Sequence, residues 1–139
     1  MVKKYLTFIV LMLVSVLFFS SCTKTNYSWN DVLNDVNLLK DNNYAVYLEN
    51  SKENQDRANK EFLSWGLNIT TTNVIGCFKD STNVVYFEEF ESEKQAKELY
   101  EYQISNLGKD RSIKFCLKGN IVISSNYDEA IKLLGYNFE

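Results

Sequence analysis

The sequence predicts an α+β domain in which antiparallel strands form a sheet and helices pack against it. Segments with apolar residues at helical spacing alternate with short β-prone runs along the chain. Two pairs of β-prone runs are separated only by turn residues, at 80–83 and 118–120, which indicates hairpins. The 118 residues that follow residue 21 are enough for one domain with a hydrophobic core.

Four segments have the spacing of amphipathic helices. Ser28 is a suitable N-cap for the first of them. Ser92 begins the third, Gln95 stands at the capping-box position, and Gly108 suits the C-terminal cap. A single polar residue, Gln103, interrupts the apolar stripe of this third helix. The expected helices cover residues 28–42, 54–67, 92–108 and 128–134.

Five runs are expected to form strands, at 44–49, 73–80, 84–90, 112–118 and 121–125. The last two form the clearest hairpin of the chain. A three-residue loop at 118–120 pairs Phe115 with Ile123 and gives one coherent apolar face. A two-residue turn would pair Phe115 with Ser124 and mix the faces. The sequence therefore predicts the three-residue loop, with Cys116 directed away from the main apolar face.

The predicted elements after the first helix follow the order β-α-β-β-α-β-β-α. The first six match the split βαβ pattern of ferredoxin-like folds. We therefore expect a ferredoxin-like antiparallel sheet with helices on one face, an extra N-terminal helix, and a C-terminal β-hairpin and helix. The usual strand order of that fold places the strands of Cys77 and Cys116 at opposite edges of the sheet. This favours two unpaired cysteines, although an exported pair is able to form a disulfide.

The first 22 residues form a segment of a different kind. A basic pair at residues 3–4 precedes an apolar run over residues 5–19, and two small serines and Cys22 follow it. A basic start, an apolar core and a small-residue cleavage site are typical of a secretory signal peptide. The apolar run is shorter than the roughly 20 residues that a membrane-spanning helix needs. A cleaved signal is therefore favoured over an uncleaved membrane helix, which is the alternative.

The cysteine directly after the small residues makes the segment more specific. The segment resembles a bacterial lipoprotein signal, with Phe19 at the position where that family usually has Leu. The resemblance implies that Cys22 is lipidated and becomes the first residue of the mature chain. An ordinary signal peptide followed by a chance cysteine is the other interpretation. The predicted organisation is a signal peptide at 1–21, a lipidated cysteine and linker at 22–28, and one α+β domain at 29–139.

The resemblance also predicts where the protein works. Two or more acyl chains on Cys22 would anchor the protein stably to a membrane, whereas a single chain binds only marginally. The expected location is the outer face of the bacterial plasma membrane, or the periplasmic side of an envelope membrane. The membrane, through the lipid on Cys22, is then one partner, and another envelope protein is a second candidate. An open edge of the sheet is able to accept a strand from such a protein.

Charge and composition argue against several functions. Removal of residues 1–21 takes two lysines away and leaves 13 basic and 18 acidic side chains, a net charge of −5. An acidic chain of this kind lacks the clustered cations that nucleic-acid binding needs. Histidine is absent, which removes the commonest general base and the commonest zinc ligand. We therefore expect no nucleic-acid partner, no catalytic residue, no metal site and no cofactor.

Two groups of side chains in the domain allow either a functional or a structural interpretation. Glu88, Glu89, Glu91 and Glu93 form the densest acidic cluster, but acids are favoured at a helix N-terminus and no calcium-binding loop accompanies them. Tryptophans and tyrosines could line a sugar- or peptide-binding groove, but most stand on elements that are expected to pack. The sequence thus predicts a non-enzymatic accessory or binding domain. A small envelope hydrolase that uses Asp or Glu carboxylates is the alternative.

Overall fold

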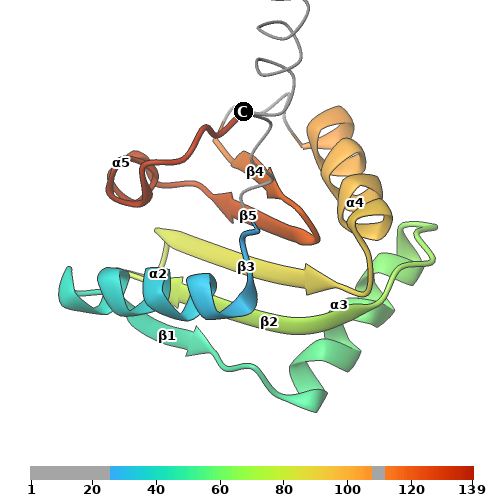
Figure 1. The fold of residues 1–139 in the computed structure, drawn as a ribbon, viewed down its shortest axis with the longest axis horizontal. Helices are drawn as coiled ribbons and strands as arrows, with labels where there is room; N and C mark the ends of the chain where they lie inside the picture. The colour runs from blue at the N-terminus through green and yellow to red at the C-terminus, as the bar shows by residue number, and fades with distance from the viewer. Residues whose placement is uncertain (1–25, 108–111) are drawn as a thin grey trace, which may run out of the picture.

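The computed structural model describes residues 26–107 and 112–139. These residues form the α+β domain that the sequence predicts, with four helices and a five-stranded antiparallel sheet (Figure 1). The elements are α2 (Trp29–Asp41), β1 (Ala45–Leu48), α3 (Lys52–Ser64), β2 (Thr71–Phe78), β3 (Val84–Phe90), α4 (Glu93–Asn106), β4 (Lys114–Lys118), β5 (Ile121–Ser125) and α5 (Asp128–Leu134). The predicted signal peptide and Cys22 lie outside the described residues. Within the described ranges, no helix has the length and apolar content needed to cross a membrane.

A serine directly precedes three of the four described helices, α2, α3 and α4. Ser28 directly precedes α2, as predicted. The hydroxyl of Ser92 accepts a hydrogen bond from the backbone N–H of Gln95 at 3.3 Å, which confirms the predicted start of α4. Ser51 caps α3 in the same way, so that helix begins slightly earlier than the sequence predicts. Gly108, the predicted C-terminal cap of α4, lies outside the described residues.

The sheet has the strand order β1-β2-β3-β5-β4, and every neighbouring pair is antiparallel. This order matches the ferredoxin-like pattern only roughly, because β1 is an edge strand here and an inner strand in that fold. The position of α3 explains the difference. Asn50, just before α3, donates to Asn73 and accepts from the N–H of Val74. Asn59 in α3 accepts from the N–H of Thr71, so α3 is tied to β2, which returns antiparallel beside β1.

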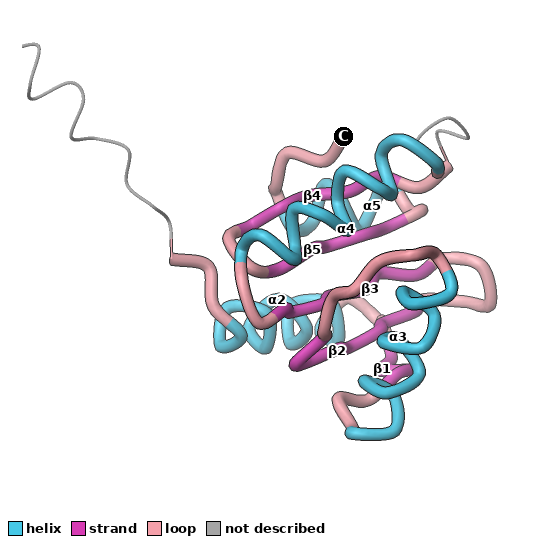
Figure 2. The backbone as a smooth tube through the Cα atoms, turned by 90° about the vertical axis from the view of Figure 1, so that its right-hand side faces the viewer, coloured by secondary structure: helices cyan, strands magenta, loops and turns pink. Residues whose placement is uncertain are grey.

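Helices cover both faces of the sheet. α3 and α4 lie on one face, as expected for the two helices of the ferredoxin-like core, with α3 against β2 and α4 against β4 and β5 (Figure 2). The extra helices α2 and α5, for which the sequence predicts no particular face, pack on the other face. Two hydrophobic clusters result. One includes Val85, Phe87 and Ile123 of the sheet, beneath α2 and α5. In the other, Phe62 of α3 and Leu99 of α4 pack with Phe90 of β3.

The β4–β5 hairpin differs in register from the prediction. Phe115 pairs with Ser124 and Cys116 with Ile123, so residues 119–120 alone form the turn. The glycine of this turn has a φ of +60°, a value that two-residue hairpin turns require and glycine adopts readily. The predicted three-residue loop assumed that only one face of the hairpin is buried. Because helices cover both faces, Phe115 and Cys116 are both buried, on opposite sides of the sheet.

Cys77 and Cys116 are free and buried. They lie on β2 and β4, with β3 and β5 between these two strands. Burial raises the pKa of the Cys77 thiol to about 11 and also raises the pKa of Cys116. Thiols in such surroundings stay protonated at neutral pH and pack as small apolar side chains.

Candidate functional site

Cys22, the site residue that the sequence predicts, lies outside the described residues, and the acidic cluster does not form one site. Glu88 and Glu89 are neighbours on β3, so their side chains lie on opposite faces of the sheet and line different cavities. Glu91 and Glu93 are exposed before and at the start of α4. In the part of the chain that the structure describes, no group of three or more His, Cys, Asp or Glu side chains could hold a metal ion.

A cavity of about 420 Å³ lies between α3 and α4, above the middle of β3. We call it the helix groove. It forms because α3 packs against β2 and α4 packs against β4 and β5, which leaves the middle of β3 between the two helices (Figure 2). The apolar part of its lining includes Leu48, Ala58, Phe62, Trp65, Val74 and Leu107. A mostly apolar cavity with a few polar groups is typical of small-molecule binding sites.

Tyr86 on β3 lies on the floor of the helix groove, in a position that depends on a glycine of the neighbouring strand. A Cβ atom placed on Gly76 would lie 2.7 Å from Cε1 of Tyr86 and 3.0 Å from Cβ of Leu48. Gly76 therefore leaves the space in which the Tyr86 ring lies. Burial raises the pKa of Tyr86, and Tyr47 and the nearby carboxylates of Glu88 and Glu61 add to this effect.

Glu88 follows on the same face of β3. It pairs across the sheet with Val74 on β2 and Val122 on β5, so its backbone is flanked by apolar residues. Burial raises the pKa of Glu88 to about 7, and the charge of Glu61 on α3 adds to this effect. No basic side chain of the described residues offsets the shift. Glu88 therefore gains and loses its proton near neutral pH, unlike an ordinary glutamate.

Gln103 brings an unused amide to the helix groove from α4. The residue is 6 % exposed, and its Oε1 atom is buried without a hydrogen-bond partner among the described residues. Leaving a buried polar group without a partner costs about 1–3 kcal/mol. Because Gln103 lines the groove, a bound molecule that reaches this oxygen would supply the missing hydrogen bond. The groove thus holds hydrogen-bonding capacity that the surrounding side chains do not use.

Stacked aromatic rings join the two helices beside the helix groove. The rings of Trp65, which follows α3, and Tyr102, in α4, are nearly parallel, with centroids 5.4 Å apart and an interplanar angle of 12°. Trp65 also contacts Phe62, with ring centroids 5.7 Å apart. Aromatic contacts of this kind contribute about 0.5–1.5 kcal/mol beyond the burial of their surface. They help to fix the separation of α3 and α4, and with it the width of the groove.

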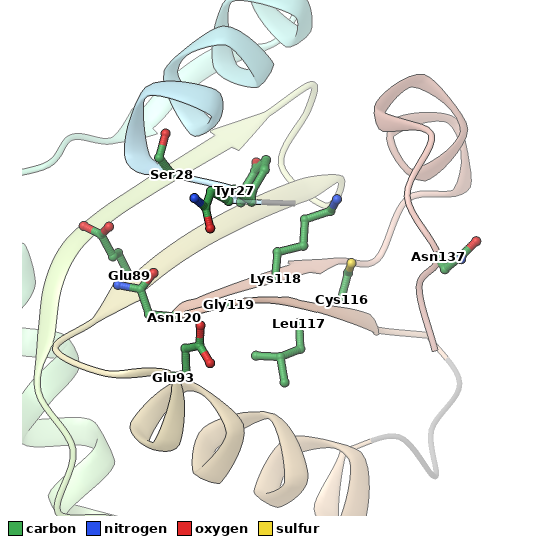
Figure 3. Close-up of a pocket in the computed structure, with 11 residues that line it drawn as sticks. Tyr27, Ser28, Glu89, Glu93, Cys116, Leu117, Lys118, Gly119, Asn120 and Asn137 are labelled. Atoms are coloured by element: carbon green, nitrogen blue, oxygen red, sulfur yellow. The ribbon is translucent and has the colours of Figure 1, made fainter. Parts of the chain in front are cut away.

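A second and more open cavity, of about 670 Å³, lies where the chain enters the domain. We call it the N-terminal cavity. Figure 3 shows Asn120 at the β4–β5 turn, between Glu89 on β3 and Glu93 at the start of α4. Lys118 lies on the side of Tyr27, with its Nζ 5.0 Å from the centroid of the Tyr27 ring. The lining of this cavity is more polar than that of the helix groove and includes residues beside the first described position, Asn26.

Several polar side chains of the N-terminal cavity already have partners. Lys118 Nζ lies 3.6 Å from the centroid of the Tyr136 ring. Glu89 accepts a hydrogen bond from Asn73, and the side chain of Asn120 donates to the carbonyl of Phe90 at 2.8 Å. A ligand would have to compete with these contacts. The helix groove is therefore the better candidate for a binding site, although it is the smaller cavity.

A buried carboxylate near the N-terminal cavity has a structural role. Asp35 on α2 accepts hydrogen bonds from the hydroxyls of Tyr27 and Tyr136, at 2.5 and 2.8 Å. Burial and the bond to Asp35 raise the pKa values of both tyrosines. The two rings meet edge to face, with centroids 5.6 Å apart. These contacts join the start of the domain, α2 and the C-terminal segment, and they leave the Asp35 carboxylate engaged.

The edges of the sheet offer little room for a partner strand. β1 is four residues long, with an irregularity in its pairing between Val46 and Leu48. On the other edge, Glu139 and Phe115 of β4 exchange two backbone hydrogen bonds of 2.8 Å. Short, irregular or covered edges disfavour the addition of a further strand. The edge interaction expected from the sequence thus has weaker support than binding in the helix groove.

Sequence reasoning missed the helix groove, although two signals for it are present in the chain. Gln103 is the polar residue that interrupts the apolar stripe of α4, and it proves to be buried. Glu88 stands between Tyr86 and Phe90 in the alternation of β3, on a face that is otherwise apolar or aromatic. Each position is unusual for a polar side chain, but only the placement of α3 and α4 brings both residues to one cavity.

Comparisons with family models, with curated proteins and with solved structures find no match to this chain.

Proposed function

We propose that the protein is a lipid-anchored, non-enzymatic binding domain of the bacterial envelope. Cys22 would carry the lipid, and the helix groove would hold a small ligand. The observation that carries the binding role is the presence of Glu88 and the unpartnered amide of Gln103 in one mostly apolar cavity. Binding sites combine an apolar wall with a few polar groups that orient the ligand, and the helix groove has both.

The N-terminal sequence supports the anchor. The basic start, the apolar run and the two serines before Cys22 follow the pattern of a lipoprotein signal. An acidic domain gains little from anionic lipid, so the acyl chains would supply the membrane affinity. The domain would then face the exterior of the bacterial plasma membrane, or the periplasm, where soluble ligands are accessible.

The anchor is tested by the intact mass of the protein purified from bacterial membranes. The wild-type chain is expected to lack residues 1–21 and to carry added acyl mass, because lipidation and cleavage occur at the same cysteine in the family that the signal resembles. A Cys22→Ser variant is expected to lack the acyl mass. Mass spectrometry of both proteins, with fractionation of membranes and soluble proteins, provides the measurement.

Two other results would contradict the lipid anchor. An intact N-terminus in both proteins would favour the uncleaved membrane helix. Loss of residues 1–21 in both, without added mass in either, would indicate an ordinary signal peptide and make Cys22 a chance residue.

The binding role is tested through the two tryptophans of the chain. Trp65 lines the helix groove, whereas Trp29 packs on the opposite face of the sheet. A library of small water-soluble compounds is titrated into labelled protein, and the indole N–H resonances are followed by NMR. Ligands of the groove are expected to shift the Trp65 resonance and to leave that of Trp29 unchanged. Compounds that shift only Trp29 would place the binding site elsewhere.

One observation favours a second function, a hydrolase that uses carboxylates. Glu88 and Glu61 line the same cavity, and the pKa of Glu88 is raised to about 7. A carboxyl group with a raised pKa in the same cavity as a second carboxyl group is the pattern of a general acid with its partner, as in glycosidases. Hydrolysis of p-nitrophenyl glycosides that is lost in both Glu88→Gln and Glu61→Gln would favour this function. Ligand binding without turnover would favour the binding domain.

A further inference from the structure

The charged side chains around the helix groove determine which ligand charge is favoured. Glu88 faces the cavity from β3 and Glu61 from α3. Arg57 is the basic side chain among the described lining residues, but it is 66 % exposed and pairs with Glu53 at 3.4 Å. Glu61 is exposed as well, so these two opposite charges stand at the rim, and Glu88 alone makes the inner part of the groove acidic. Complementarity favours a positively charged ligand over a neutral or negative one.

The remaining side chains of the groove indicate what the uncharged part of such a ligand looks like. Phe62 and Trp65 form an apolar wall on the α3 side, and Leu107 lies on the α4 side. These side chains suit a short aliphatic or aromatic body. The ring of Tyr86 lies on the floor next to Glu88, where an aromatic face can stabilise a cation by about 0.5–2 kcal/mol.

Gln103 supplies a second and independent sign that a ligand belongs here. Its side chain lines the groove, is almost completely buried, and has an amide oxygen without a partner among the described residues. A buried amide in this state is unfavourable for the protein alone. A ligand N–H group that reaches the oxygen would relieve it by donating a hydrogen bond.

We propose that the helix groove binds a small organic ammonium ion, with the charged nitrogen between Glu88 and Gln103 and the apolar body against Phe62 and Trp65. This inference rests on the proposed binding function and specifies the class of ligand. The ammonium N–H groups donate to the carboxylate of Glu88 and to the amide oxygen of Gln103, so both polar groups gain the partner that they lack.

Binding of such a cation is linked to the release of a proton. The titratable and charged groups that face Glu88 are Glu61, Arg57 and Tyr86, and α4, β2 and β5 contribute neutral side chains. Below neutral pH the Glu88 carboxyl holds a proton, which passes to solvent when the ammonium ion binds. With a Glu88 pKa of about 7, affinity is expected to fall about tenfold between pH 8 and pH 6.

The experiment compares three probes of similar shape and different charge: 2-phenylethylamine, 2-phenylethanol and phenylacetate. Each is titrated into the full chain purified in detergent, with the Trp65 indole resonance as the readout and Trp29 as the internal reference. A titration into detergent alone corrects for partition of the probe. At pH 8 the amine, which stays protonated across this range, is expected to bind at least about tenfold more tightly than the alcohol. Phenylacetate is expected to bind most weakly.

Three variants separate the charge from the shape of the groove. Glu88→Gln keeps the size of the side chain, and it is expected to reduce amine affinity to that of the alcohol and to abolish the pH dependence. Glu89→Gln is the matched control, because Glu89 lies on the opposite face of the sheet, and it is expected to change neither property. Gln103→Leu is expected to weaken amine binding and to leave the pH dependence in place.

The possible outcomes distinguish this inference from the proposed function. Equal affinities for the amine and the alcohol, or an unchanged amine affinity in Glu88→Gln, would overturn the ammonium assignment and leave the groove as a binding site. No response of Trp65 to any probe at millimolar concentration would overturn the assignment and the binding role of the groove together. Tighter binding of Nα-acetyl-lysine methylamide than of 2-phenylethylamine would overturn the small-molecule ligand in favour of a lysine side chain of a peptide.

Discussion

Glu88 and Glu89 are the same residue type at adjacent positions, and their surroundings differ because successive strand residues alternate between the faces of a sheet. Glu89 accepts a hydrogen bond from Asn73 on the side of the N-terminal cavity. Glu88 lies in the helix groove, where burial raises its pKa to about 7 and no basic side chain of the described residues offsets this. A carboxylate held in this way does not stabilise the fold, which is consistent with a role toward a ligand.

A change in the pH dependence of stability is expected for Glu88→Gln. The pKa of Glu88 in the folded state, about 7, is above its ordinary value of 4.5. The folded state therefore retains a proton that the unfolded state has released, and stability falls as the pH rises from about 4.5 to 7. At pH 8 the variant is expected to be more stable than the wild type by about 1–3 kcal/mol, a range reduced because Glu88 is only partly buried.

Urea unfolding followed by circular dichroism between pH 4.5 and pH 8 provides this measurement. The lowered pKa of Asp80, about 2, affects stability only at more acidic pH and does not interfere. Glu89→Gln is the control and is expected to follow the wild-type profile. A difference in the free energy of unfolding between the wild type and Glu88→Gln that stays constant from pH 4.5 to pH 8 would show that Glu88 does not titrate in this range.

At the scale of helices and strands, the sequence predicts the type and order of all elements that the structure describes, because their signals are local. Ser28 and Ser92 precede helices, and the turn at Asp80–Asn83 separates β2 from β3. The Asp80 carboxylate accepts from the N–H groups of Thr82 and Asn83, which explains why these residues form a turn.

The strand order and the hairpin register could not be predicted, because both depend on contacts between distant segments. β1 lies at the edge beside β2, and hydrogen bonds of Asn50 and Asn59 to β2 accompany this arrangement. The register of β4 and β5 depends on the burial of both faces, which requires α2 and α5 to cover one side. The helix groove is a result of the same long-range packing, so Glu88 and Gln103 could be noted individually but not brought together.

Gly76→Ala is expected to disturb the pairing of β2 and β3 beside the helix groove. The added Cβ would lie 2.7 Å from the ring of Tyr86, so the ring has to move. Overpacking of this kind typically costs about 1–3 kcal/mol. The free energy of unfolding is measured for Gly76→Ala in the wild-type background and in a Tyr86→Ala background. A similar loss in both backgrounds would show that the Tyr86 ring is not the cause.

At the scale of the whole molecule, one polar and aromatic cluster joins the two ends of the domain. Tyr27 at the start and Tyr136 near the end both donate to Asp35 of α2, and Lys118 of β4 lies over both rings. Contacts between segments so far apart in sequence form only when the domain is complete. The cluster is therefore expected to contribute to global stability and not to the helix groove on the opposite face of the sheet.

Asp35→Ala is expected to lower the free energy of unfolding by about 2–4 kcal/mol, because it leaves two tyrosine hydroxyls without their acceptor. Asp41→Ala is the matched control, since Asp41 is exposed at the end of the same helix. Urea unfolding measures the loss, and the Trp65 indole resonance reports on the groove, which is expected to be unchanged. Equal stability of the two variants would show that the Asp35 cluster does not join the ends of the domain.

The side of the domain at which the N-terminal segment enters also affects how the domain would be oriented at a membrane. Tyr27 packs on the side of α2 and α5, and the helix groove opens on the other side of the sheet. The backbone between Cys22 and Tyr27 can extend at most roughly 18 Å. With a lipid on Cys22, a linker of this length would keep the α2–α5 side of the domain near the bilayer. The opening of the helix groove would then face the surrounding solution. A dissolved amine would then reach Glu88 without crossing the lipid headgroups. The lipid anchor would thus orient the binding domain as well as hold it at the membrane.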